Sequence, residues 1–127
     1  MTKNNLCKSI LIAEDNDDIR ETLQEVLTCE GYEVHLAKNG KEALAKLKTL
    51  PAPTLVLLDL MMPVMNGWEF LDAQSADAVL APHQIVTLSA VASTQSLEDA
   101  TPLKTAGSLL KPIAIEPLLS KVREFCG

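Results

Sequence analysis

The chain has 127 residues, enough for one domain with one hydrophobic core, and its 47% hydrophobic and 22% charged residues are typical of a globular protein. The net charge of −6 and the absence of a Lys/Arg cluster argue against unassisted nucleic-acid binding, because phosphate contacts need concentrated positive charge. The longest apolar run near the start, Ile10 to Ala13, is far too short for a signal peptide or a membrane span, so we expect a cytoplasmic protein without membrane contacts.

Short apolar runs alternate with longer amphipathic stretches in the first half of the chain. Ser9–Ala13 predicts a strand that leads into acidic residues, and Asp17–Glu30 then carries apolar residues at helical spacing. Gly31 is suited to end that helix. Glu33–Leu36 predicts a second, shorter strand, and Lys41–Leu50 predicts a helix that is closed by prolines.

The second half continues the alternation. Thr54–Leu58 is apolar almost throughout, which is typical of a parallel strand covered on both faces. A helix is predicted for Asn66–Gln74, and two further strands for Ile85–Leu88 and Ser108–Leu110. Pro117 stands where a last helix with an apolar face would begin.

One more helix is expected between Val91 and Thr105, although Pro102 interrupts it. Five strands alternating with about five helices predict an α/β fold, a five-stranded parallel sheet with helices on both faces. We expect residues 1–127 to form a single domain. In such sheets ligands bind outside the carboxyl ends of the strands, so residues that follow strands are the candidate functional ones.

Polar residues follow four of the five predicted strands: Glu14 and Asp15, then Asp59, Ser89 and Lys111. In a parallel sheet they would converge on one edge. Crowded carboxylates raise one another's pKa, and Mg²⁺, a hard cation common in phosphate chemistry, would relieve that repulsion. Lys111 and Ser89 could then contact phosphate oxygens, which leaves Asp59, at the end of the most buried strand, as the nucleophile.

The motifs around these residues resemble the response-regulator receiver domain of two-component signalling. They are IAEDNDDIR, LVLLDLMMPVMNGWEF, Ser89 with Ala90, and Lys111 with Pro112. The resemblance extends from Ile10 to Phe125, and in length the chain is similar to single-domain chemotaxis-type regulators. It implies the flavodoxin-like strand order 2-1-3-4-5 and a cytoplasmic phosphoprotein.

The resemblance also implies a role for each matching position. Asp59 is the phosphoacceptor, and Mg²⁺ is held by Asp59, Asp15, Glu14 and the backbone carbonyl of Met61. Lys111 and Ser89 contact the phosphoryl group.

The same resemblance implies the partners and the kind of activity. The phosphoryl donor is a phosphohistidine on a sensor histidine kinase or a histidine phosphotransfer protein, and the output is an unknown downstream protein. The domain would promote only its own phosphorylation and dephosphorylation, so it is not an enzyme with a separate substrate. The Lys111–Pro112 peptide is a candidate cis bond.

Some features depart from the family or leave other interpretations open. The family usually has an aromatic residue three positions before the lysine, where this chain has Ser108. Taken singly, an acidic pair caps a helix and an Asp after a strand makes a turn. The main alternative is a pseudo-receiver that binds partners without phosphorylation. A phosphohydrolase would need a second Asp where Met61 stands, and a flavin-binding domain would need a phosphate-cradling loop after the first strand.

The three cysteines, Cys7, Cys29 and Cys126, are widely spaced. An odd number without a Cys-x-x-Cys pair is typical of reduced thiols in a cytosolic protein. We therefore expect free thiols. Metal ligation is the less favoured alternative, because two of the three lie in apolar segments where Cys packs as a small hydrophobe.

Overall fold

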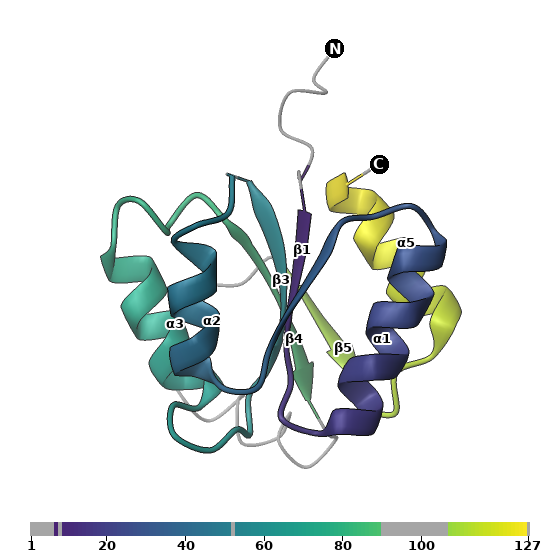
Figure 1. Ribbon diagram of the computed structural model, residues 1–127, viewed down its shortest axis with the longest axis horizontal. Helices are drawn as coiled ribbons and strands as arrows, with labels where there is room; N and C mark the ends of the chain where they lie inside the picture. The colour runs from purple at the N-terminus through teal and green to yellow at the C-terminus, as the bar shows by residue number, and fades with distance from the viewer. Residues whose placement is uncertain (1–6, 8, 52, 90–106, 127) are drawn as a thin grey trace.

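The computed structural model describes residues 7, 9–51, 53–89 and 107–126. Its five strands form one parallel sheet with the order β2-β1-β3-β4-β5 (Figure 1). The strands are β1 (Ser9–Ala13), β2 (Val34–Ala37), β3 (Thr54–Asp59), β4 (Gln84–Ser89) and β5 (Gly107–Leu110). The predicted α/β class and the strand order 2-1-3-4-5 are therefore confirmed.

Helices cover both faces of the sheet. They are α1 (Asp17–Cys29), α2 (Gly40–Leu47), α3 (Gly67–Ala76) and α5 (Ile115–Cys126). Helices α1 and α5 lie on one face, and α2 and α3 lie on the other (Figure 1). The helix expected within Val91–Thr105 falls outside the described residues. No helix in the described ranges is long and apolar enough to cross a membrane.

Most helix ends differ from the sequence-based prediction by one to three residues, and two of these differences have a clear physical cause. Helix α2 ends at Leu47 instead of Leu50, because the amides of Thr49 and Leu50 bond three residues back, to Lys46 and Leu47, in the tighter pattern of a fraying helix end. Helix α5 begins at Ile115, two residues before Pro117. A proline fits in the first turn because the first amides of a helix have no partner within it.

The central strands β1 and β3 are buried along their whole length, which explains their nearly continuous apolar sequences. Side chains alternate between the two faces. Ile10 and Ile12 of β1 pack in the cluster beneath α1 and α5, whereas Leu11 and Ala13 pack in the cluster beneath α2 and α3. These two apolar layers fix the sheet, and with it the position of the loops at its carboxyl edge.

Each of the helices α1, α2 and α3 begins with an Asn whose side chain accepts a hydrogen bond from the amide three residues later. The caps are Asn16, Asn39 and Asn66. In α3 the Glu69 side chain also accepts from the Asn66 amide, which completes a capping box. The caps satisfy amides that lack partners at a helix start, so they define where each loop after a strand ends.

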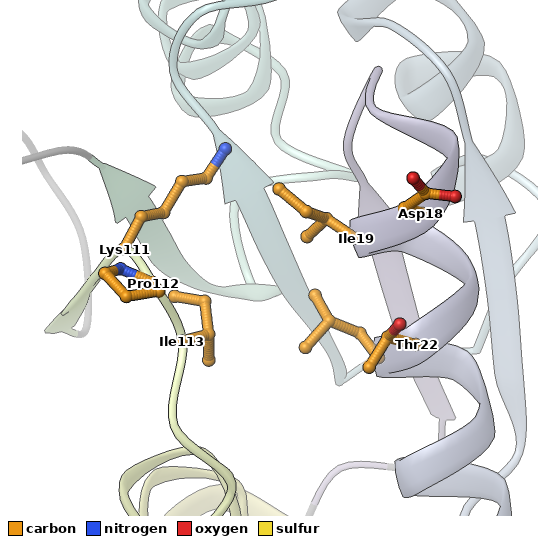
Figure 2. Close-up of a pocket in the computed structure, with 7 residues that line it drawn as sticks. Asp18, Ile19, Thr22, Lys111, Pro112 and Ile113 are labelled. Carbon is orange, nitrogen blue, oxygen red and sulfur yellow. The ribbon is translucent and has the colours of Figure 1, made fainter.

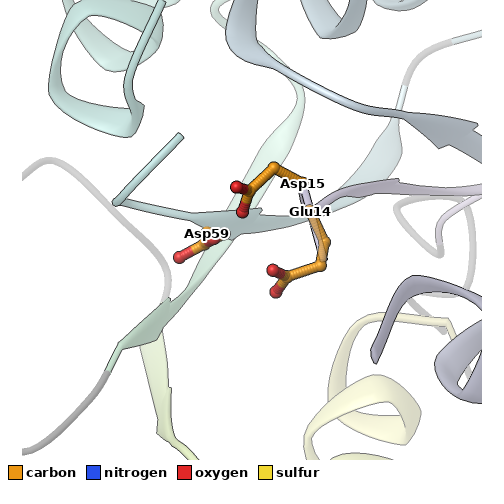
Figure 3. Close-up of side chains that lie close together, drawn as sticks. All are labelled: Glu14, Asp15 and Asp59. Atoms are coloured by element: carbon orange, nitrogen blue, oxygen red, sulfur yellow. The ribbon is translucent and has the colours of Figure 1, made fainter. Parts of the chain in front are cut away.

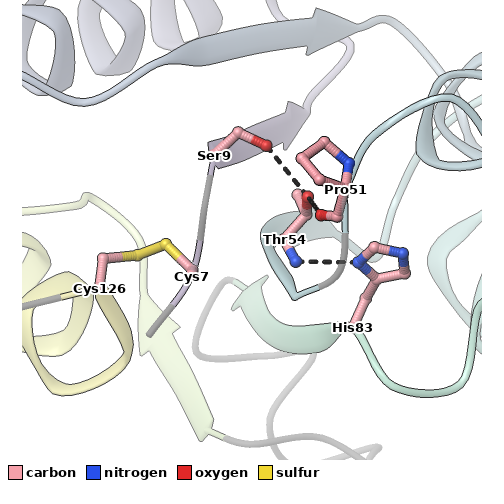
Figure 4. Close-up of a disulfide and its surroundings, with 6 residues drawn as sticks. All are labelled: Cys7, Ser9, Pro51, Thr54, His83 and Cys126. Atoms are coloured by element: carbon pink, nitrogen blue, oxygen red, sulfur yellow. Dashed lines mark hydrogen bonds between the residues drawn. A yellow bond between two sulfur atoms is a disulfide. The ribbon is translucent and has the colours of Figure 1, made fainter. Parts of the chain in front are cut away.

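A buried polar network stands at the opposite, amino-terminal edge of the sheet (Figure 4). The Thr54 amide donates to His83 Nδ1 at 2.9 Å, and the Thr54 hydroxyl donates to the Pro51 carbonyl at 2.8 Å. The hydroxyls of Ser9 and Thr54 lie 3.0 Å apart. Burial lowers the pKa of His83, which keeps its ring neutral as an acceptor. The network ties the start of β1 and β3 to the loop before β4.

The expectation of three free thiols is wrong for two of the cysteines. Cys7 and Cys126 form a disulfide, with their Cα atoms 4.5 Å apart (Figure 4). The two cysteines are 119 residues apart in sequence and come together because α5 packs beside the start of β1. The sequence alone does not indicate this contact. Cys29 is free, as expected, and it is exposed.

Candidate functional site

Three carboxylates meet at the carboxyl edge of the sheet. Glu14 and Asp15 follow β1, Asp59 ends the adjacent strand β3, and one oxygen from each lies within 4.8 Å of the others (Figure 3). Glu14 is fully buried and Asp59 is 3% exposed, whereas Asp15 is exposed. The strand pairing therefore buries two of the three carboxyl groups and leaves the third at the surface. The carboxylates line a shallow cavity of about 500 Å³.

Lys111, directly after β5, reaches into the same cavity. Its Nζ lies 3.0 Å from Glu14 Oε1 and 3.4 Å from Asp59 Oδ1. The Lys111–Pro112 peptide is cis, which confirms that expectation. The Met61 amide donates to Asp59 Oδ1 at 3.2 Å, and Met61 also lines the cavity. Of the six predicted site residues, five thus come together: Glu14, Asp15, Asp59, Met61 and Lys111.

Ser89, the sixth predicted residue, ends β4, and its backbone is in register with Leu110 of β5. The strand therefore carries Ser89 to the carboxyl edge of the sheet. Its side chain lies outside the part of the structure that is described. Ser108, which replaces the family's aromatic residue, is exposed on β5.

Burial and the neighbouring Glu14 carboxylate raise the pKa of Asp59 to about 7, although the Met61 amide and Lys111 favour its charged form. For Lys111, burial lowers the pKa, but the contacts with Glu14 and Asp59 outweigh it and the pKa is raised overall. Among the described residues, the Lys111 ammonium is the cation that contacts the carboxylates of Glu14 and Asp59 directly.

The donor set fits a hard divalent cation. Glu14 Oε1 is buried and, apart from its ion pair with Lys111 Nζ at 3.0 Å, has no hydrogen-bond partner among the described residues. Mg²⁺ prefers oxygen ligands, commonly one or two carboxylates together with waters and phosphate oxygens. Glu14, Asp15 and Asp59 are accordingly the residues that could hold such an ion.

Arg20 contributes to the site, and sequence reasoning missed it. Arg20 is 6% exposed, and its guanidinium reaches back from α1 to donate to the Glu14 carbonyl at 2.9 Å. It also pairs with the Asp17 carboxylate. This fork fixes the backbone of the loop that carries both acidic residues. The only sequence signal was a cation one helical turn after Asp17, a spacing common on helix surfaces.

The loop between β3 and α3 is held by backbone hydrogen bonds on both sides. The Gly67 amide donates to the Leu60 carbonyl at 3.0 Å, and the Gly40 amide donates to the Met65 carbonyl at 2.9 Å. Inside the loop the Met65 amide bonds to the Pro63 carbonyl across Val64, whose φ is 68°. This is a γ-turn with a β-branched residue in the left-handed region, which is strained.

Replacing Val64 with Asn is expected to raise the free energy of unfolding by about 1 kcal/mol, because Asn tolerates positive φ and Val does not. Val64 is 75% exposed, so the change removes little packing. Chemical denaturation measures the effect. Val79→Asn is the matched control, since Val79 is 71% exposed without positive φ. Equal effects of both substitutions would show that Val64 carries no strain.

Gly67 allows the loop to lie against the end of β3. A Cβ at Gly67 would stand 2.6 Å from the Leu60 Cα and 2.9 Å from the Asp59 carbonyl oxygen. Gly67→Ala is therefore expected to destabilise the protein by about 2–3 kcal/mol, as measured by denaturation. Gly107→Ala is the control, because its Cβ would meet only the flexible end of Lys121 at 3.3 Å. A Gly67→Ala protein as stable as Gly107→Ala would contradict the expectation.

A second hollow adjoins the carboxylate site. It is a groove of about 240 Å³ between the start of α1 and the segment after β5 (Figure 2). Apolar side chains from both sides, Ile19, Leu23 and Ile113, line it together with Lys111. Because Ile19 and Lys111 border both hollows, the groove is continuous with the site around Asp59.

Comparison with known proteins identifies this arrangement. The response regulator receiver domain family matches residues 10–123. The response regulator RR06 of Streptococcus pneumoniae is 34% identical over 91% of this chain, which spans 51% of that protein. The sporulation initiation phosphotransferase F of Bacillus subtilis is 30% identical, with 93% of each chain covered. The chemotaxis response regulator CheY4 of Vibrio cholerae superposes with a TM-score of 0.82 at 29% identity, over 94% of this chain and 98% of that one.

The chain belongs to the response regulator receiver domain family of two-component signalling. It spans about half the length of several curated relatives that it matches, and nearly the whole length of the sporulation phosphotransferase. Receiver domains are signalling domains, generally not classical enzymes, that accept phosphoryl groups from histidine kinases or phosphotransfer proteins and typically bind Mg²⁺ at an acidic site.

Proposed function

We propose that this chain is a phosphoryl-accepting receiver in which Asp59 takes the phosphoryl group from a phosphohistidine. The observation that carries the proposal is the convergence of Asp59, Glu14, Asp15 and Lys111 from three strands on one cavity. A carboxylate oxygen of Asp59 attacks the phosphorus atom while the bond to the histidine nitrogen breaks. The product is an acyl phosphate on Asp59, and the imidazole leaves with its electron pair.

The residues of the site act mainly by position and charge. Lys111 balances negative charge that gathers on the phosphoryl oxygens, and Ser89 would donate its hydroxyl to one of them. The Met61 amide orients the Asp59 carboxylate through Oδ1. Glu14, Asp15, Asp59 and the Met61 carbonyl would hold Mg²⁺, which when bound supplies the positive charge that three carboxylates lack.

The test uses a small acyl-phosphate donor with Mg²⁺, followed by intact mass measurement. One adduct of about 80 Da, labile to hydroxylamine as an acyl phosphate is, is the expected result. Chelation of Mg²⁺ should suppress the adduct. A protein that binds Mg²⁺ but remains unmodified would instead support the alternative, a pseudo-receiver that works as a phosphorylation-independent interaction module.

The partners and the setting follow from the same proposal. The donor is a sensor histidine kinase or a histidine phosphotransfer protein, and its imidazole would approach Asp59 beside the groove bordered by Ile19, Ile113 and Lys111. The added charge would switch a protein-binding surface near β4 and β5. We place the chain, residues 1–127, in the cytoplasm as one receiver domain without direct nucleic-acid contacts.

A further inference from the structure

Two segments from opposite ends of the sequence meet at the amino-terminal edge of the sheet. Cys7 lies just before β1, and Cys126 is the last residue of α5 (Figure 4). Besides the disulfide, the Cys7 amide donates to the Phe125 carbonyl at 2.7 Å. This junction is remote from the phosphoryl-acceptor site, because Cys7 precedes the start of β1 whereas Glu14 follows its end.

The disulfide lies at the edge of the core and is only partly buried. Cys7 and Cys126 are half-buried at the margin of the apolar cluster beneath α1 and α5. Neither cysteine is fully buried, so the disulfide lies where a solvent thiol can approach it more readily than a bond in the core. The bond also closes a loop of 119 residues, so breaking it returns a large conformational freedom to the unfolded chain.

We propose that Cys7 and Cys126 are a reversible thiol–disulfide site that clamps the last turn of α5 to the start of β1. In the closing reaction the two thiols lose two electrons and two protons to glutathione disulfide. One sulfur–sulfur bond forms in the protein, one breaks in the oxidant, and two glutathione thiols are released. Reduction by glutathione reverses the same exchange.

The clamp controls the end of α5 without dissolving the fold. Leu118 and Val122 of α5 are buried and keep the helix docked when the bond opens. Phe125 and Cys126 are only half-buried, so on reduction the last turn loses its covalent restraint and keeps the weaker hydrogen bond between the Cys7 amide and the Phe125 carbonyl. The site around Asp59 depends on β1, β3 and Lys111, and it stays assembled in both redox states. The oxidation state therefore sets the anchoring of α5 separately from phosphorylation.

The test equilibrates the purified chain with glutathione mixtures from fully oxidised to fully reduced. Thiol titration and intact mass should then show one free thiol and a mass about 2 Da lower in the oxidised form, and three thiols in the reduced form. The oxidised form should melt about 10 °C higher, because of the large closed loop. Amide exchange should rise on reduction in the last turn of α5.

Alanine substitutions identify the responsible cysteines. Cys7→Ala and Cys126→Ala should each abolish the redox dependence of melting and exchange, whereas Cys29→Ala, the matched control, should keep it. Wild-type protein treated with a strong reductant provides the same comparison if a variant folds poorly. Three thiols after oxidation, a bond that includes Cys29, or a bond that persists in fully reduced glutathione would each overturn the proposal. These readouts do not depend on phosphorylation of Asp59.

Discussion

Replacing Asp59 with Asn is expected to abolish the phosphoryl adduct and, at the same time, to stabilise the protein at pH 8 without Mg²⁺ by about 2–4 kcal/mol. The stabilisation follows from the raised pKa of Asp59, about 7, which burial and Glu14 cause. At pH 8 the folded protein must hold a desolvated carboxylate beside another. An amide has no charge, can still accept from the Met61 amide, and can donate to Glu14.

The sign of the pH dependence follows from the direction of the shift. Because the pKa of Asp59 is higher in the folded than in the unfolded state, the folded state binds the proton more tightly. The favourable contribution is complete below about pH 4 and is lost as the pH rises to about 7. Wild-type protein should therefore lose stability over this window relative to Asp59→Asn, and the difference should be constant above it.

Denaturant unfolding at several pH values measures this effect. Asp15→Asn is the matched control, since Asp15 is exposed and its charge is solvated. Mg²⁺ should stabilise the wild type more than Asp59→Asn. It should therefore reduce the difference between their free energies of unfolding. A variant that is less stable than the wild type at pH 8, or one that still gains the adduct, would refute the electrostatic account or the assignment of the acceptor.

Replacing Lys111 with Met should have the opposite effect on stability. The change leaves Glu14 and Asp59 buried without their cation, whose Nζ lies 3.0 and 3.4 Å from their oxygens. Removing one partner of a buried charge cluster costs about 3–5 kcal/mol when the others remain charged. Phosphorylation from a small donor should also slow by about 100-fold, because the variant loses the ammonium group that balances negative charge on the phosphoryl oxygens.

Unfolding measurements at pH 8 and single-turnover phosphorylation rates test the Lys111 prediction. Lys121→Met is the control, because the contact of Lys121 with Glu124 is a surface pair at 3.6 Å that contributes little. Lys111→Arg keeps the charge and should retain most of the stability but not the full rate, since a planar fork does not replace a compact ammonium. Unchanged rate and stability in Lys111→Met would remove Lys111 from the site.

The strands and the acidic cluster could be predicted because their signals are local and repeated. A buried parallel strand such as β3 has an apolar sequence on both faces, and the residue after it must stand at the carboxyl edge. The disulfide could not be predicted, because nothing near Cys7 or Cys126 indicates that α5 returns to the start of β1. Arg20 could not be predicted for a related reason. Its role depends on a hydrogen bond to the backbone carbonyl of Glu14, and because every residue has a carbonyl, the sequence does not indicate which one Arg20 contacts.

The helix caps have a consequence for the chemical durability of the protein. Asn39–Gly40 and Asn66–Gly67 are Asn–Gly pairs, the sequence in which a backbone amide most readily attacks the Asn side chain to form a cyclic imide and release ammonia. Here the Gly40 amide donates a hydrogen bond to the Met65 carbonyl and the Gly67 amide donates one to the Leu60 carbonyl, while both Asn side chains are hydrogen-bonded as helix caps. The glycine nitrogen that would attack and the Asn side chain that it would attack are thus both held in place by hydrogen bonds. Deamidation at these pairs should be slow in the folded protein and fast in the unfolded protein. The rate of deamidation would therefore measure how often the loops that contain these pairs open.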